Sequence, residues 1–310
     1  MKNMSKRAKS NIILTITALI WGSTFIAQKT GGYIGTFTFC AMRGILATIA
    51  LGIVVLIMDR ARRRKGDPEA IEKSRFTKTT FIGGFVVGIF LFLGTVFQQQ
   101  GLVTASAGEA GFITTLYVVL VPLIGIFMGK RIGPLVWAGA VLAAVGLYYL
   151  CTNGEGLKLE PGAAALLMCA FTYSFQVISV GKYSPLTDVV KLSLIETATF
   201  AVLSFICMLI FEDPSFEAIK SEWFAVAYAG ILSSTVGYTL QLEGQKGADP
   251  TEASLIMCLE SVFAMFFGAV LLHERMGGYQ LFGCLLIFIA IVIAQLPDGF
   301  VREKLEKFTK

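Results

Sequence analysis

The chain contains ten apolar stretches, each long enough to cross a lipid bilayer as a helix. A helix needs about 20 mostly apolar residues to cross about 30 Å of hydrocarbon. Lipid offers the backbone no hydrogen-bonding partners, so helices are the expected spans, and the sequence lacks the alternating pattern of a membrane β-barrel. The sequence therefore predicts an all-α membrane protein with ten transmembrane helices, at 11–29, 33–58, 79–100, 106–129, 133–151, 160–181, 186–211, 223–243, 250–272 and 279–297.

The composition agrees with a chain that lies mostly in lipid. Of 310 residues, 55% are hydrophobic and only 15% are charged, whereas soluble domains carry about 25% charged residues. The net charge of +5 comes largely from short basic segments, which we interpret as an orientation signal rather than as affinity for nucleic acid. The six cysteines show no metal or redox spacing and there is one histidine, so we expect neither a metal site nor a cofactor.

Lysine and arginine gather in segments that an even number of spans places on one side of the membrane. They occur in the N-terminal tail (1–10), in the loop 59–78, at Lys130 and Arg131, and in the C-terminal tail (298–310). Short loops rich in these residues stay in the cytoplasm. We therefore expect both tails to be cytoplasmic.

Part of the chain is duplicated. The stretch 94–129 aligns without a gap with 237–272, with roughly ten identities in about 36 positions at a constant offset of 143. The identities include polar residues, such as Gln98 with Gln241, which a shared apolar composition would not align. The sequence therefore predicts an internal repeat.

The repeat has a consequence for topology. Five spans in each half is an odd number, so the second half must enter the membrane from the opposite face, giving inverted repeats. We expect a first five-helix repeat at 11–151 and a second at 160–297. The earlier spans align less closely, with Trp21 opposite Tyr173 at an offset of 152.

The repeated acidic residues Glu109 and Glu252 have a local explanation. Ser106 and Asp249 precede them by three residues, the spacing of a capping box, and Pro250 fits the first position of a helix. We interpret both glutamates as helix-capping acids, with a role in a transport pathway as the alternative.

Two charged residues lie deep within spans. Each such charge costs about 2.5–3.5 kcal/mol near a helix centre, so it needs a partner, a wet cavity or a function. Arg43 could receive a carboxylate or phosphate, or clamp two helices together. Glu196, opposite Arg43 at an offset of 153, could couple transport to protons, or be a partner of Arg43 or Lys191. Because Lys191 lies near a span end and can snorkel, we do not expect it in the site.

Further polar and aromatic residues are candidates for the same pathway. Glu260, which aligns with Tyr117, could bind an ammonium group or a proton, or be held by a neighbouring side chain. Gln98 and Gln241 could line the pathway or join helices. The aromatic candidates, which could equally be packing residues, are Trp21, Phe97, Tyr117, Tyr173 and Tyr238.

In these features the chain resembles the EamA family of bacterial drug/metabolite transporters. The resemblance covers about 11–297 and rests on ALIWGS at 18–23, Arg43, GEAGFIT at 108–114, and Leu259-Glu260 followed by His273, Glu274 and Arg275. It implies a secondary carrier of small metabolites in the bacterial inner membrane, often an exporter of amino acids or related compounds, with a central cavity between the halves. The chain departs from the family pattern at Ser261, where a proline is frequent.

The combined expectation is a secondary active transporter of amino-acid-like or carboxylate-bearing metabolites that works by alternating access, with export as the expected direction and proton coupling as an option. An organic-phosphate or nucleotide-sugar exchanger would need several deep cations, and Arg43 is the only one; a small-solute channel is a further alternative. We expect no enzyme, because no nucleophile–base constellation is visible.

The oligomeric state could be a monomer or a homodimer. The pairs Gly84/Gly88 and Gly125/Gly129 have small-xxx-small spacing, which lets helices approach closely. We expect them to pack inside the bundle, with dimerisation as the alternative.

Overall fold

The computed structural model describes residues 5–66, 68–73, 75–105, 107–152, 154, 156, 161–271 and 277–296. Within these ranges the chain is helical and contains no β-strand. Ser106 and 273–275 lie outside the described residues, as does the side chain of Glu109, so the capping box at 106–109 stays a prediction.

Seven helices are long and uninterrupted: α1 (Lys6–Gly31), α2 (Thr36–Lys65), α4 (Lys78–Leu102), α7 (Pro134–Thr152), α8 (Ala163–Tyr183), α9 (Val189–Phe211) and α15 (Gly278–Gln295). Three further stretches consist of consecutive pieces: α5 (Ala107–Thr115) with α6 (Tyr117–Phe127), α11 (Trp223–Tyr228) with η3 (Ala229–Gly237) and α12 (Tyr238–Gln245), and α13 (Pro250–Met257) with α14 (Leu259–Leu271). Short connecting helices are η1 (Gly32–Ile34), α3 (Pro68–Lys73), η2 (Ser184–Leu186) and α10 (Phe216–Ser221).

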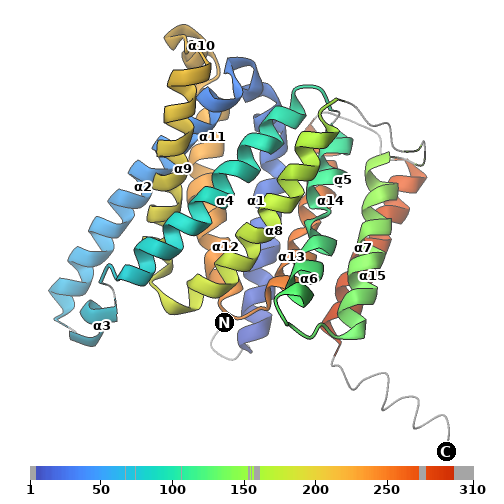
Figure 1. Ribbon diagram of the computed structural model, residues 1–310, viewed down its shortest axis with the longest axis horizontal. Helices are drawn as coiled ribbons and strands as arrows, with labels where there is room; N and C mark the ends of the chain where they lie inside the picture. The colour runs from blue at the N-terminus through green and yellow to red at the C-terminus, as the bar shows by residue number, and fades with distance from the viewer. Residues whose placement is uncertain are drawn as a thin grey trace, which may run out of the picture.

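The long helices run between two opposite faces of one bundle (Figure 1). At one edge α7 packs against α15, and at the other α2 packs against α9, while α4 lies between α8 and α9. The start of α1, the α2–α3 corner and the turn between α6 and α7 lie on the same face, at the bottom of the view. The basic segments of the first half therefore share one end of the bundle.

Eight helical stretches of the described residues are long and apolar enough to cross a membrane. They coincide with eight of the ten spans predicted from the sequence. The other two predicted spans, 11–29 and 223–243, are also helical, as α1 and as α11–η3–α12. Both carry buried polar side chains, such as Thr17 and Ser234, which face the interior of the bundle.

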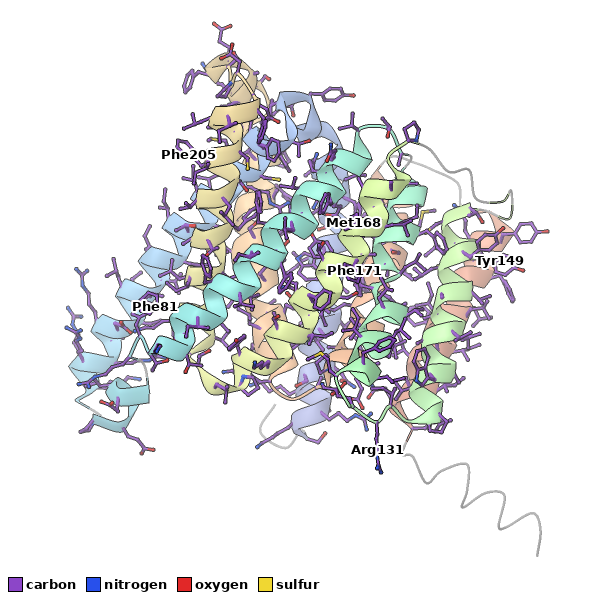
Figure 2. The ribbon with its side chains drawn as sticks, viewed as in Figure 1. Phe81, Arg131, Tyr149, Met168, Phe171 and Phe205 are labelled. Carbon is purple, nitrogen blue, oxygen red and sulfur yellow. The ribbon has the colours of Figure 1, made fainter. Side chains whose placement is uncertain are left out.

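The outer surface of the bundle is apolar. Large hydrophobic side chains point away from the helices into the surroundings (Figure 2). Exposed examples that the figure labels are Phe81 on α4, Met168 and Phe171 on α8, and Phe205 on α9. Such a surface is suited to lipid rather than to water.

One of the two predicted glycine pairs packs helix against helix. A Cβ placed on Gly84 would lie 2.5 Å from Cβ of Ile195 on α9, and one on Gly88 would lie 2.6 Å from Cβ of Thr199, so the prediction of packing within the bundle is confirmed there. The prediction for the second pair is wrong, because Gly129 has a φ of +80° and its Cβ would meet no atom within 4 Å. Gly129 forms the left-handed turn after α6, a conformation that glycine adopts without strain.

Two glycines that correspond in the repeat each pack against an aromatic ring of the opposite half. A Cβ on Gly94 would lie 2.5 Å from the ring of Tyr173, and a Cβ on Gly237 would lie 2.6 Å from Nε1 of Trp21. Both the glycines and the aromatic residues are counterparts in the sequence repeat. Each half therefore supplies the space for the other half's ring.

The same reciprocity continues about two turns along. A Cβ on Gly101 would lie 2.5 Å from Cγ of Leu166, and a Cβ on Gly244 would lie 2.8 Å from Cγ of Leu14. Leu14 and Leu166 stand at the same offset of 152 as the two aromatic residues. The repeated glycines thus determine how closely α4 approaches α8, and how closely α12 approaches α1.

The α2–α9 pair is fastened at both ends by related positions. At one end the Glu212 carboxylate accepts hydrogen bonds from Thr38 N at 2.7 Å and Thr38 Oγ1 at 2.6 Å, at the start of α2. At the other end Lys191 Nζ lies 2.7 Å from Asp59 Oδ2. The two acids are 153 residues apart in the sequence, and so are the two partners. The two contacts therefore obey the offset that relates Arg43 to Glu196.

Candidate functional site

A cavity of about 40 Å³ lies within the bundle. Its walls come from α1, α4, α6, α8, η3, α12 and the α13–α14 region. The aromatic lining residues are Trp21, Phe25, Tyr117, Tyr173 and Tyr238, the polar ones are Gln28, Gln98, Gln176, Ser233, Gln241 and Glu260, and Val177 and Met257 complete the lining. Both halves of the chain therefore form one internal site.

Seven of the residues predicted from the sequence meet in this cavity: Trp21, Gln98, Tyr117, Tyr173, Tyr238, Gln241 and Glu260. Arg43 and Glu196 lie just behind the wall, each joined to a lining residue by a hydrogen bond. Phe97 does not line it, and instead borders an outer depression with Pro161 and Met168. Adjacent residues of a helix point about 100° apart, so Phe97 faces away from the cavity that Gln98 lines.

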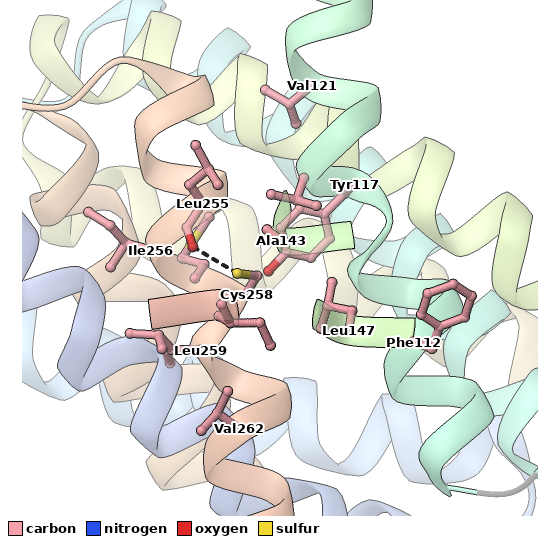
Figure 3. Close-up of a cluster of buried hydrophobic side chains, with 14 of the residues drawn as sticks. Phe112, Tyr117, Val121, Ala143, Leu147, Leu255, Ile256, Cys258, Leu259 and Val262 are labelled. Atoms are coloured by element: carbon pink, nitrogen blue, oxygen red, sulfur yellow. Dashed lines mark hydrogen bonds between the residues drawn. The ribbon is translucent and has the colours of Figure 1, made fainter. Parts of the chain in front are cut away.

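Two walls of the cavity are broken helices. The helix of residues 107–127 is interrupted at Leu116, and that of residues 250–271 at Cys258. Cys258 Sγ donates to the carbonyl of Leu255 at 2.9 Å, and Tyr117 points from α6 toward this junction (Figure 3). Transporters commonly bind substrates where such discontinuous helices meet.

Glu260 supplies a carboxyl group to the cavity wall. Its carboxylate is 5% exposed, and its Oε1 accepts from the hydroxyls of Thr115 at 3.4 Å and Tyr117 at 3.5 Å. Both distances are at the long limit for a hydrogen bond between oxygens, while Thr115 lies closer to Ser261, at 3.0 Å. The carboxylate is therefore loosely held and retains the capacity to accept from a ligand.

Arg43 provides a positive charge behind the cavity wall. It is fully buried, and donates from Nε to Ser234 Oγ at 3.0 Å and from Nη2 to Ser233 Oγ at 3.2 Å. Its Nη1 has no hydrogen-bond partner among the described residues. A hydroxyl that accepts a hydrogen bond keeps its own proton to donate, so Ser233 can act as a donor toward the cavity that it lines.

The two serines reach Arg43 because their helix is wound as a π-helix. Residues Ala229–Gly237 form this segment, and Thr235 Oγ1 donates five residues back to the carbonyl of Gly230 at 2.9 Å. A Cβ on Gly230 would lie 3.1 Å from the Arg43 carbonyl oxygen, so the glycine lets α2 come close. Wide turns of this kind are rare and frequent at functional sites.

Glu196 communicates with the cavity through two amides. Its Oε1 accepts from Gln176 Nε2 at 3.2 Å. Gln176 and Gln241 exchange a pair of hydrogen bonds, each of 3.0 Å, and both line the cavity. The Oε2 atom of Glu196 is buried without a hydrogen-bond partner among the described residues. Gln241 thus both lines the cavity and joins helices, and the sequence analysis missed Gln176.

The predicted alternative partners of Glu196 bind elsewhere. Arg43 binds Ser233 and Ser234. Lys191 pairs with Asp59, and it is 3% exposed rather than snorkelling to the surface. Within the described ranges, therefore, Glu196 has a neutral amide and not a cation as its hydrogen-bonding partner.

One face of the bundle is held by ion pairs that cross between the halves. Asp249 caps α13 by accepting from Thr251 N at 2.9 Å, with Pro250 in the first turn, as predicted. The capping-box contact from Glu252 stays a prediction. Glu252 pairs with Arg7 at 2.8 Å and Lys130 pairs with Asp249 at 3.2 Å. These contacts tie the start of α1 and the α6–α7 turn to the start of α13.

The sequence was compared with known protein families and proteins. The model of the EamA-like transporter family matches this chain twice, at residues 8–152 and 161–295. A solved crystal structure is similar in fold, with a TM-score of 0.75 and 22% identity, over 93% of this chain and 96% of that one.

Relatives that match most of the chain come from distant organisms. An uncharacterized transporter of Archaeoglobus fulgidus is 29% identical over 94% of this chain and 87% of its own length. A WAT1-related chloroplastic protein of Arabidopsis thaliana is 25% identical over 93% of this chain and 69% of its own. The uncharacterized transporter YoaV of Bacillus subtilis is 22% identical over 90% of this chain and 94% of its own. Because the family model covers nearly all of both halves, this multi-pass membrane protein belongs to the EamA-like transporter family.

Proposed function

We propose that the protein is a secondary active transporter of small, amino-acid-like metabolites that carry an amine and a carboxylate. The observation that carries the proposal is the pair of opposite charges at one cavity, with Glu260 in the wall and Arg43 behind the lining hydroxyl of Ser233. The carboxylate of Glu260 suits an ammonium group, and the Arg43-polarised hydroxyl suits a carboxylate. The aromatic walls add cation–π and apolar contacts. As a member of a transporter family, the protein moves a small-molecule substrate across a lipid bilayer rather than catalysing a reaction.

The proposed architecture is ten transmembrane helices in two inverted five-helix repeats, at 11–151 and 160–297. The double match of the family model supports it, and so do the reciprocal packing contacts of Trp21 with Gly237 and of Tyr173 with Gly94. Inverted repeats around a central site are the usual basis of alternating access. Both halves of one chain line the cavity, which favours a monomeric transport unit, with a homodimer as the alternative.

The ion pairs on one face support a state that is closed on that side. The cavity extends along α1 from Trp21 to Gln28, away from the end of α1 where Arg7 pairs with Glu252. The basic segments at that end of the bundle favour its placement on the cytoplasmic side of a bacterial inner membrane. In export, substrate would enter after these ion pairs open and would leave from the present state.

Reporters fused at 62–66 and at 153–156 should report opposite sides of the membrane, the first cytoplasmic and the second external.

Counterflow in proteoliposomes tests the proposed function. Vesicles preloaded with an unlabelled L-amino acid should take up the labelled one faster than empty vesicles, because a carrier returns faster when loaded. The same amino acid without its carboxylate, or without its amine, should stimulate less, because each loses one of the two charged partners. Equal uptake by empty and loaded vesicles would indicate a channel. Stimulation by organic phosphates alone would favour the phosphate-exchanger alternative.

Glu196 is the proposed proton-coupling group. It is buried outside the cavity, and the Gln176–Gln241 pair lies between it and the cavity. A proton on Oε2 would leave Oε1 accepting from Gln176, but a proton on Oε1 would make that atom a donor, so that the Gln176 amide would have to turn its oxygen toward Glu196. That turn breaks the paired bonds to Gln241. Proton binding and the shape of the cavity are thereby linked.

The helices around Glu196 offer few competing charges. From α4 it meets Gly84 and Gly88. Arg43 on α2 and Tyr238 on α12 are buried ionisable residues of neighbouring helices, and neither is hydrogen-bonded to it. Glu196 is therefore placed to hold or release a proton without disrupting an ion pair.

Glu196→Gln should uncouple transport from protons. In wild-type vesicles we expect an imposed pH gradient to accelerate flux several-fold, whereas the variant should transport at a rate independent of the gradient, because glutamine cannot carry the proton. Glu243→Gln, which removes a surface carboxylate paired with Lys9 and Lys246, is the matched control and should keep the response. A wild-type flux indifferent to the gradient would contradict proton coupling altogether.

A further inference from the structure

A second pocket, distinct from the transport cavity, lies at the corner between α2, α3 and α9. Its volume is about 360 Å³. The lining residues are Asp59, Arg62, Arg63, Ile71, Arg75, Phe76 and Lys191. Four of these seven are cationic and one is acidic, so the pocket favours an anion.

The carboxylates nearby neutralise only part of this charge. Asp59 is shared between Lys191, at 2.7 Å, and Arg62, at 3.8 Å. Asp188 binds Arg62 at 2.9 Å, and also caps α9 by accepting from Val190 N and Lys191 N. Both acids are therefore engaged on the protein side of the pocket.

Two guanidinium groups lie on the open side of the pocket, and a third is buried in its wall. Arg62 Nη1 is buried without a hydrogen-bond partner in the described part of the chain. Arg63 is exposed at the end of α2, and Arg75 has an exposed pairing with Glu72 at 3.0 Å, of a kind that contributes little in water. Three guanidinium groups thus border one pocket, and guanidinium forks match the oxygens of a phosphate group.

Lipid-facing surface begins directly beside these cations. Lys191 Nζ lies 4.6 Å from the ring centroid of Phe76, which it holds at the pocket. Phe76 is 39% exposed and stacks on Phe81 at 5.5 Å. Phe81 points outward from the bundle (Figure 2). Ile82 and Phe85 on the same helix are exposed as well. A free phosphate ion would use only the cations, whereas a phospholipid would use the cations and the apolar stripe together.

We propose that this pocket binds the phosphate headgroup of an anionic phospholipid, with its acyl chains along the outer face of α4. Basic pockets between membrane helices are the sites at which such headgroups are usually held. The bound lipid would join the 59–78 loop to the start of α9, and so brace the end of the α2–α9 pair. This site does not depend on what the central cavity carries.

The test measures lipid binding by the purified full-length protein, by native mass spectrometry and by titration in detergent. Phosphatidylglycerol should bind tightly and phosphatidylcholine should not. The double variant Arg63→Gln/Arg75→Gln should weaken phosphatidylglycerol binding about 30-fold, since each basic residue near an anionic lipid contributes about five-fold. Arg63→Gln alone should weaken it about five-fold.

The matched control removes the same charge from the same end of α2. Arg60→Gln/Arg64→Gln changes two exposed arginines that do not line the pocket, and should weaken binding less than about three-fold. An equal loss in the control would overturn the proposal in favour of a diffuse surface charge. Displacement of the lipid by inorganic phosphate at similar concentration would also overturn it, because the ligand would then be a free anion.

Discussion

Glu260→Gln is expected to lower the transport of amine-bearing substrates by more than about 100-fold. The carboxylate is 5% exposed and faces the cavity, so a bound ammonium group would lose its charge partner in a place that water hardly reaches. Removing one partner of a buried pair costs about 3–5 kcal/mol, which corresponds to more than 100-fold. Initial rates in proteoliposomes, at equal protein incorporation, measure the effect.

The control for Glu260 keeps the carboxylate and changes its surroundings. Thr115→Val removes a hydroxyl 3.4 Å from Glu260 Oε1, and should lower the rate only a few-fold because that hydrogen bond is long. Full activity of Glu260→Gln with the same substrate would remove Glu260 from the binding site. A loss of similar size for carboxylates without an amine would mean that it acts on the fold and not on the ammonium group.

Arg43→Ala is expected to abolish transport of carboxylate-bearing substrates. The arginine is the buried cation behind Ser233, and alanine would leave Ser233 and Ser234 without the guanidinium. Because the side chain is also fully buried, its removal opens a void beside Phe39, so thermal unfolding of the purified variant must be measured together with flux.

The two serines separate the role of Arg43 in binding from its role in packing. Ser233→Ala should weaken carboxylate-bearing substrates about 10-fold or more, since a hydrogen bond to a charged group contributes about 1.5–3 kcal/mol. Ser234→Ala should have an effect below about three-fold, because Ser234 contacts Arg43 but does not line the cavity. Equal losses in both variants, or none in Ser233→Ala, would contradict a relay through Ser233.

Much of the architecture could be predicted from the sequence because its repeat contains residues that restrict how closely helices pack. Gly94 and Gly237 are informative, since a glycine at a helix crossing specifies a close approach. The burial of Arg43, Glu196 and Glu260 follows from the cost of charge in lipid, and the structure places all three at or behind the cavity wall. The partners of Arg43 and Glu196 did not follow, because an offset between repeats relates positions without stating a contact.

The remaining features leave little trace in the sequence. The breaks at Leu116 and Cys258 contain neither glycine nor proline, the usual causes of a helix interruption. The π-helix is visible only as Ser233-Ser234-Thr235 in an apolar stretch. Phe97 was misplaced because a span that is apolar all round has no amphipathic face to indicate which side is interior.

The reciprocal packing contacts of Trp21 with Gly237 and of Tyr173 with Gly94 bear on how such a chain could arise. A single five-helix protein with one glycine and one aromatic residue would make both contacts by pairing with a copy of itself in the opposite orientation. In that ancestor any change would alter both contacts at once. Fusion of two copies into one polypeptide would let each of the two contacts change without the other. An indole could then occupy one side of the cavity and a phenol the other.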